Sequence, residues 1–129
     1  MVSTASLTMI SRGQILGEPA PELKPAELTE RLDGAQPPLI LDVRQPREFR
    51  TGHIRGAEPI PLARLAHLAP ALPRNHDVVC ICRTGQRSRA AARQLRKAGV
   101  RAFNLEGGML AWYRAGLPVD KETTDKEQS

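Results

Sequence analysis

Stretches of apolar residues alternate with stretches of helical spacing along the middle of the chain. The segments 39–43, 77–82 and 100–105 are short and mainly apolar, and glycine, proline or charged residues bound them, which is typical of buried strands. A briefer apolar segment surrounds Ile60. Helical spacing and helix-stop residues predict helices over 25–32, over 46–49, over 61–68, from Gly85 to Gly99, and from Gly108 to Gly116.

This order of elements predicts an α/β fold, with a parallel sheet and helices on both of its faces. A length of 129 residues suits a single domain of this kind. Little periodicity precedes residue 20, and only polar or charged residues follow residue 119. We therefore expect a flexible N-terminal extension over 1–19, a folded domain over 20–119 and a polar C-terminal tail over 120–129.

The most informative segment joins the strand 77–82 to the helix that follows it. In open parallel sheets, ligands bind beyond the carboxyl ends of the strands, and Cys82 lies at such an end. A helix N-terminus presents unpaired backbone N–H groups and a partial positive charge, which lower the pKa of a thiol placed there. The sequence therefore predicts a reactive thiolate at Cys82, with a substrate-binding loop made of Arg83, Thr84, Gly85, Gln86, Arg87 and Ser88.

The two cysteines receive different interpretations. Ordinary packing is the competing explanation for both, because free cysteine is among the most buried residue types. The glycine, the arginines and the helix start near Cys82 favour a reactive thiol at this position. Cys80 lies in the middle of the strand, so packing is favoured there over a role as a resolving thiol. Two cysteines separated by one residue of a strand lack good disulfide geometry, so the pair indicates a reducing, cytoplasmic compartment.

Charge and composition indicate which classes of molecule could bind this chain. Lys and Arg number 19 against 14 Asp and Glu, so the net charge is +5, and Arg89, Arg93, Arg96 and Lys97 share one predicted helix. Such a surface attracts anions, an acidic protein or RNA. Aromatic residues form only 3% of the chain, which argues against a base-stacking surface and so against nucleic acid. No apolar run approaches the roughly 20 residues of a membrane span, and the first residues lack the pattern of a signal peptide.

Three separated motifs resemble those of single-domain rhodaneses, and the resemblance covers roughly residues 21–119. The resemblance implies a rhodanese-like, five-stranded parallel sheet flanked by helices, and thiosulfate sulfurtransferase activity through a cysteine persulfide. The motifs are the loop 82–88; Leu41, Asp42, Val43 and Arg44 with Glu48, Phe49, Gly52, His53, Ile54, Gly56 and Ala57; and Leu105, Glu106, Gly107, Gly108, Met109, Ala111 and Trp112.

The residues of the loop supply a mechanism for that activity. The Cys82 thiolate would attack the sulfane sulfur of a small anionic donor such as thiosulfate, and the resulting persulfide would pass its sulfur to cyanide, a small thiol or a protein thiol. These steps require no metal and no organic cofactor. Arg83 and Arg87 would attract the donor and orient its oxygens, although either could instead be a solvated surface charge.

Three further residues of the motifs are interpreted as structural. The resemblance places His53 in a turn, and a thiol that is already ionised has little use for a general base. Asp42 and Arg44 are expected to form an ion pair within the domain, and Asp42 to help shape the loop.

Two other functions stay open at this point. A phosphatase or arsenate reductase places an arginine six positions after its cysteine, where this chain has Ser88, and the arginine comes one residue early at Arg87. The shorter loop favours a single sulfur atom over a tetrahedral phosphate. The domain could also be a sulfur carrier or an interaction module without turnover of its own.

Overall fold

The computed structural model describes residues 19–122, so the predicted extension and tail lie outside it except for Pro19 and residues 120–122. Within this range no helix is long and apolar enough to cross a membrane. The elements are β1 (Glu22–Leu23), α2 (Pro25–Leu32), β2 (Leu39–Asp42), α3 (Pro46–Thr51), β3 (Glu58–Pro59), the 3₁₀ turn η1 (Leu62–Arg64), α4 (Leu65–Leu68), the 3₁₀ turn η2 (Ala69–Ala71), β4 (Val78–Ile81), α5 (Gln86–Lys97), β5 (Ala102–Leu105) and α6 (Gly108–Arg114).

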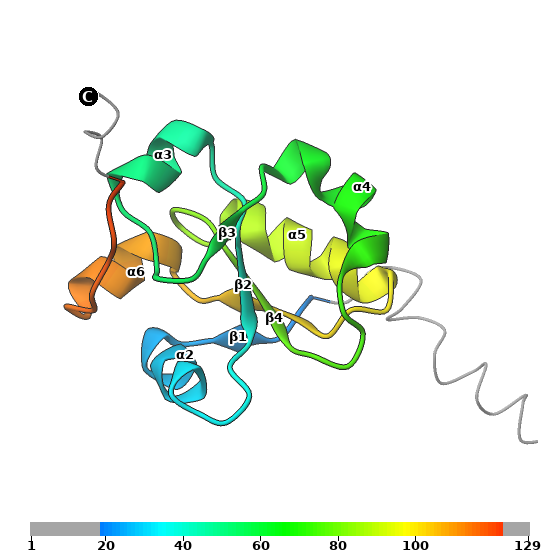
Figure 1. The fold of residues 1–129 in the computed structure, drawn as a ribbon, viewed down its shortest axis with the longest axis horizontal. Helices are drawn as coiled ribbons and strands as arrows, with labels where there is room; N and C mark the ends of the chain where they lie inside the picture. Colours follow the sequence, from blue (N-terminus) through cyan, green and yellow to red (C-terminus); the bar gives the residue numbers. More distant parts are fainter. Residues whose placement is uncertain (1–18, 123–129) are drawn as a thin grey trace, which may run out of the picture.

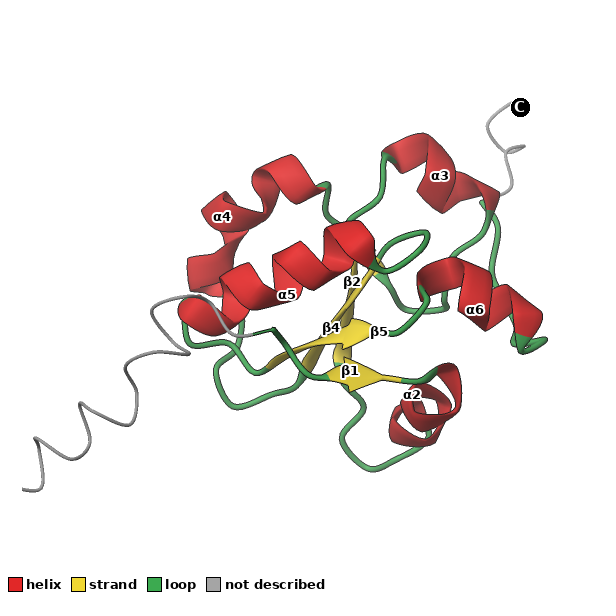
Figure 2. Cartoon of the chain, turned by 180° about the vertical axis from the view of Figure 1, so that it is seen from behind, coloured by secondary structure: helices red, strands yellow, loops and turns green. Residues whose placement is uncertain are grey.

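The five strands form one parallel sheet in the order β1-β5-β4-β2-β3. Helices α4 and α5 lie on one face of the sheet, and α2 and α6 lie on the other (Figure 1). Figure 2 shows the same two layers from behind, with α3 beside the loop that precedes α5. The predicted α/β fold with a five-stranded parallel sheet is confirmed.

Strand β4 lies at the centre of the sheet and is buried along its whole length. Its alternate side chains enter two separate cores: Val78 and Cys80 pack on the α4–α5 face, and Val79 and Ile81 pack on the α2–α6 face. Cys82, one residue past the strand, continues this alternation and lies on the α4–α5 face. The loop that it begins therefore starts from the fully buried central strand of the sheet.

The two edge strands, β1 and β3, are too short for the sequence pattern to indicate them. Strand β1 has two residues, and its pairing with Asn104 and Leu105 of β5 is the evidence for it. Strand β3 ends just before the predicted apolar segment, and the Ile60 N–H extends the ladder by donating to the Asp42 carbonyl over 2.9 Å. Two residues are too few for the period of a strand to be visible.

The helix expected over 61–68 is divided in the structure. A 3₁₀ turn, the single turn α4 and a second 3₁₀ turn follow one another from Leu62 to Ala71. Pro70 has no N–H to donate, so regular α-helical bonding ends ahead of it. Helix α3, by contrast, continues two residues beyond the predicted Phe49 to Thr51.

Candidate active site

The loop 82–88 leaves β4 and turns sharply into α5. Gly85, directly before the helix, has φ of +99°, a left-handed conformation that side chains disfavour. A Cβ at this position would also lie 3.4 Å from the backbone nitrogen of Gly107 and the carbonyl oxygen of Leu105. Glycine therefore allows the loop to curl closely against the segment that follows β5.

A second glycine holds the loop from behind. The N–H groups of Met109 and Leu110, at the start of α6, donate to the carbonyls of Cys82 and Arg83 over 2.9 and 3.0 Å. A Cβ on Gly108 would lie 2.5 Å from both of these carbonyl oxygens, so only glycine permits the approach. The N-terminus of α6 thus fixes the backbone at the point where the cysteine emerges.

The Cys82 sulfur is surrounded by hydrogen-bond donors. The backbone N–H of Gly85 lies 3.1 Å from Sγ, and the backbone N–H and the hydroxyl of Ser88 both lie 3.3 Å from it. Burial opposes ionisation, but the donors of Ser88, Gly85 and Thr84 outweigh it, and the pKa of Cys82 is lowered from the ordinary value of a thiol. The loop therefore favours a thiolate.

Cys80 has the opposite environment. It is fully buried in the middle of β4, and burial together with the neighbouring Cys82 raises its pKa to about 12. Both cysteines are free. The Cys82 thiol therefore ionises more readily than the Cys80 thiol.

A buried amide connects the loop to the edge of the sheet. Asn104, at the end of β5, is completely buried, and its Nδ2 donates to the Glu22 carboxylate over 3.0 Å and to the Gly85 carbonyl over 3.2 Å. The Ser88 hydroxyl donates to Asn104 Oδ1. The Arg89 guanidinium donates to the same Glu22 oxygen over 3.0 Å. These bonds tie β1, β5 and α5 together directly behind the cysteine.

Helix α3 supplies a carboxylate to the loop. Glu48 accepts hydrogen bonds of 3.0 and 3.1 Å from the two terminal nitrogens of Arg87, and its Oε1 also accepts from the Gln45 N–H at the start of α3 over 2.9 Å. The pairing with Arg87 lowers the pKa of Glu48, and the pairing with Glu48 raises that of Arg87. The loop arginine, predicted to face an anionic donor, is thus held by an acid of the protein itself.

A buried ion pair holds α3 in place. Arg44 donates to both carboxylate oxygens of Asp42 over 2.8 Å each and to the Gly52 carbonyl over 2.8 Å, and the two side chains are 4% and 1% exposed. The expected Asp42–Arg44 pair is therefore present. It connects the end of β2 to the end of the helix that carries Glu48.

His53 lies in the turn that follows α3. Its Nδ1 is 2.9 Å from the Phe49 carbonyl, its ring stacks on the Phe49 ring at 3.8 Å, and its backbone pairs with Asp120. A carbonyl only accepts, so Nδ1 carries the proton. These partners are those of a structural turn, and they bring Asp120 of the predicted tail into the fold.

The remaining loop residues differ in exposure. Gly85 and Ser88 are buried against the sulfur, whereas Arg83, Thr84 and Gln86 have exposed side chains. The loop residues thus divide into those that surround the sulfur and those that face solvent.

Two side chains of this site were given no role by sequence reasoning. Glu48 lies within a quoted motif, but nothing in the sequence indicates that it reaches Arg87. Asn104 had a usable signal, since it is a lone amide in an otherwise apolar strand, and a buried polar group requires partners.

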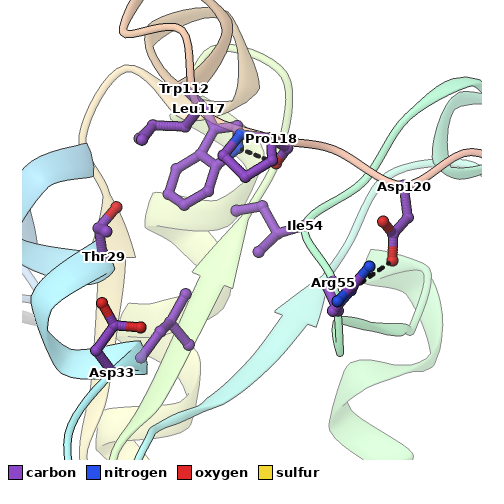
Figure 3. Close-up of a pocket in the computed structure, with 9 residues that line it drawn as sticks. Thr29, Asp33, Ile54, Arg55, Trp112, Leu117, Pro118 and Asp120 are labelled. Carbon is purple, nitrogen blue, oxygen red and sulfur yellow. Dashed lines mark hydrogen bonds and ion pairs between the residues drawn. The ribbon is translucent and has the colours of Figure 1, made fainter.

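A cavity of about 420 Å³ lies on the α2–α6 face of the sheet (Figure 3). Thr29 of α2 and Asp33, directly after this helix, line one side, Trp112 lies above them, and the Arg55–Asp120 ion pair borders the other side. None of the loop residues 82–88 lines it. Within residues 19–122, no three His, Cys, Asp or Glu side chains gather as metal ligands would.

Comparison with known protein families gives a match over most of the described residues. Residues 24–115 match the family described as Rhodanese-like domain. The chain belongs to the rhodanese-like family. The resemblance predicted from the three motifs is therefore confirmed, and relatives of this rhodanese-like chain include proteins named as sulfurtransferases.

Three similar proteins show the range of contexts in which the rhodanese-like domain occurs. A sulfurtransferase of Allochromatium vinosum is 36% identical over 99 residues, which are 76% of this chain and 92% of that protein. An HTH-type transcriptional regulator of Mycobacterium tuberculosis is 39% identical over 114 residues, which are 87% of this chain and 50% of the regulator. The crystal structure of a rhodanese-related protein from Thermoplasma volcanium superposes with a TM-score of 0.73 at 32% identity, covering 79% of this chain and 99% of that one.

Proposed function

We propose that the protein is a sulfurtransferase that carries sulfane sulfur as a persulfide on Cys82. The observation that carries the proposal is the set of donors at 3.1–3.3 Å from the Cys82 sulfur, which stabilise an anion at this atom. Both cysteines are free thiols, which suits a reducing, cytoplasmic compartment.

The first half-reaction loads the cysteine. The Cys82 thiolate attacks the outer sulfur of thiosulfate, a new S–S bond forms, and the bond between the two sulfur atoms of thiosulfate breaks with its electron pair leaving on sulfite. No proton is transferred in this step. A thiolate that the loop has already stabilised therefore needs no general base, and His53 is bonded elsewhere.

The second half-reaction removes the sulfur from Cys82. A thiolate or cyanide attacks the outer sulfur of the persulfide, and the Cys82 thiolate is the leaving group. The donors that lower the pKa of Cys82 make it a better leaving group, because thiols of lower pKa leave faster. A low-pKa cysteine thus assists unloading as well as loading.

Sulfite release and product formation test this function. We expect the protein to form thiocyanate from thiosulfate and cyanide over many turnovers, with one sulfite released per thiocyanate. A single burst equal to the protein concentration would indicate a carrier without turnover. Hydrolysis of aryl phosphates at a comparable rate would contradict the proposal.

Arg87→Ala is expected to lower kcat/KM for thiosulfate by roughly one to two orders of magnitude, mainly through KM. The positive charge of Arg87 acts on the Cys82 sulfur, so an anionic donor that reaches the sulfur would gain a charge-assisted contact with the guanidinium, and alanine removes that contact. The same loss disfavours the thiolate and raises the pKa of Cys82. Steady-state kinetics with thiosulfate, and alkylation rates of Cys82 against pH, measure both effects.

Lys97→Ala is the matched control, because Lys97 is an exposed cation near the far end of α5. Arg96 is unsuitable, since its Nε donates to the Ala102 carbonyl and its guanidinium lies 5.2 Å from the centre of the Phe103 ring. Equal damage from Lys97→Ala and Arg87→Ala would assign donor attraction to the general surface charge instead.

Glu48→Gln is expected to raise kcat/KM for thiosulfate about fivefold or less. The carboxylate competes with an anionic donor for the Arg87 guanidinium, and a partly exposed ion pair is worth at most about 1 kcal/mol. The glutamine can still accept the Gln45 N–H, so α3 keeps its start. A fall in efficiency as large as that of Arg87→Ala would mean that Glu48 is needed to position the arginine.

A further inference from the structure

The buried amide of Asn104 has a fixed orientation. Its two N–H bonds point to the Glu22 carboxylate and the Gly85 carbonyl, which are both acceptors. Rotating the amide by half a turn would place Oδ1 against these acceptors and leave three oxygens without a proton between them. Oδ1 must therefore face Ser88, and it can only accept a hydrogen bond from that side chain.

The Ser88 hydroxyl consequently has one proton and two possible acceptors. Asn104 Oδ1 lies on one side of it, and the Cys82 sulfur lies 3.3 Å away on the other. Ser88 is completely buried, so its proton is shared between these two neighbours. A bond to one acceptor withdraws the proton from the other.

The protonation state of the cysteine decides between the two arrangements. A neutral thiol can donate its S–H to the Ser88 oxygen while the hydroxyl donates to Asn104, so every group is satisfied. A thiolate has no proton to donate, and it draws the hydroxyl proton as a third hydrogen bond beside the N–H groups of Gly85 and Ser88. Ser88 must then turn away from Asn104 and leave Oδ1 without its donor.

We propose that Asn104 is a positioning residue that competes with the Cys82 sulfur for the single Ser88 proton. The hydroxyl donates to Asn104 while Cys82 is a thiol and to sulfur once Cys82 is charged. Asn104 therefore limits how strongly the loop stabilises the anion. Such a limit preserves reactivity, because the nucleophilicity of a thiolate falls as the pKa of the thiol falls.

Other charges near this network must stay constant in a test. They are the Glu48–Arg87 pair from α3 and α5, the Glu22–Arg89 pair from β1 and α5, the buried Asp42–Arg44 pair at the end of β2, the thiol of Cys80, and the exposed Arg83 and Glu106. Uncharged substitutions at Asn104 and Ser88 add or remove no charge, and the one pKa they touch directly is that of Glu22, which the Asn104 amide helps to lower. The Glu22 carboxylate keeps its bond to Arg89 when the amide is removed.

The test compares Asn104→Val, Ser88→Ala and the double variant by the pH dependence of Cys82 alkylation with iodoacetamide. Valine is close to asparagine in size and suits a strand. We expect Asn104→Val to lower the midpoint pH of Cys82 alkylation by about 0.5 to 1 pH unit, which is the effect expected of one hydrogen bond. We expect Ser88→Ala to raise this midpoint pH. In the Ser88→Ala background, Asn104→Val should produce no further shift.

If the effect of Asn104→Val on the midpoint pH depends on Ser88, Asn104 acts through the hydroxyl proton and is not merely structural. An upward shift from Asn104→Val, no shift, or an equal downward shift with and without Ser88, would overturn the proposal. Asn104→Ser, which is too short to reach Ser88 in the same way, replaces the valine variant if that variant does not fold, with the same expected results. The inference rests on Cys82 as the reacting thiol, but alkylation reports on the thiol even if the protein transfers no sulfur, so the two failures are distinguishable.

Discussion

Cys82→Ser is expected to abolish sulfur transfer, with a loss of at least about a thousandfold, while the domain stays folded. The serine oxygen cannot form or release a persulfide, and a hydroxyl ionises far less readily than a thiol. The substitution barely changes the volume, and the same N–H groups can donate to the new oxygen. Thiocyanate formation, with circular dichroism as the check on folding, measures the result.

Cys80→Ser is the matched control, two residues away on the same face of the sheet. It places a hydroxyl in a fully buried position, which costs about 1–3 kcal/mol of stability, but it leaves the loop donors unchanged. Activity per folded molecule should be retained. Equal loss of turnover in the two variants, with both folded, would remove Cys82 from its proposed place in the reaction.

Arg44→Met is expected to lower the free energy of unfolding by about 3–5 kcal/mol, because it leaves the Asp42 carboxylate buried without its partner. A domain of this size has only about 5–15 kcal/mol in total, so the variant should be folded only marginally. The loss of the bond to the Gly52 carbonyl also frees the end of α3. Urea unfolding of the variant and the wild type measures the difference.

Arg47→Ala is the control for arginine content, since Arg47 is exposed on α3, and its effect should stay within about 0.5 kcal/mol. The double variant Asp42→Leu, Arg44→Met should be more stable than Arg44→Met alone, because no buried charge is left unpaired. If Arg44→Met changes the urea midpoint no more than Arg47→Ala does, the buried pair does not stabilise the fold.

Local signals account for the parts of the site that the sequence predicts. The strand ending at Cys82, the glycine that allows the turn, and the helix with Ala91 and Leu95 on its buried face are all visible within about 20 residues, because strand and helix periods are local properties. The position of Cys82 at the start of the loop follows from the order of these elements.

The contacts that complete the site join residues far apart in the chain. Glu48 meets Arg87 across 39 positions, and Asn104 meets Glu22 across 82. Neither contact follows from spacing, because the fold brings α3 to the loop and β1 to β5. Strand β1 was missed for the same reason, since its two residues become a strand only through pairing with β5.

Intact-mass measurement after thiosulfate treatment tests the central claim most directly. If Cys82 carries sulfane sulfur, the wild-type protein and the Cys80→Ser variant gain the mass of one sulfur atom, the Cys82→Ser variant gains none, and cyanide removes the added mass. A gain that persists in Cys82→Ser, or no gain in a folded wild-type protein that consumes thiosulfate, would contradict transfer through a Cys82 persulfide.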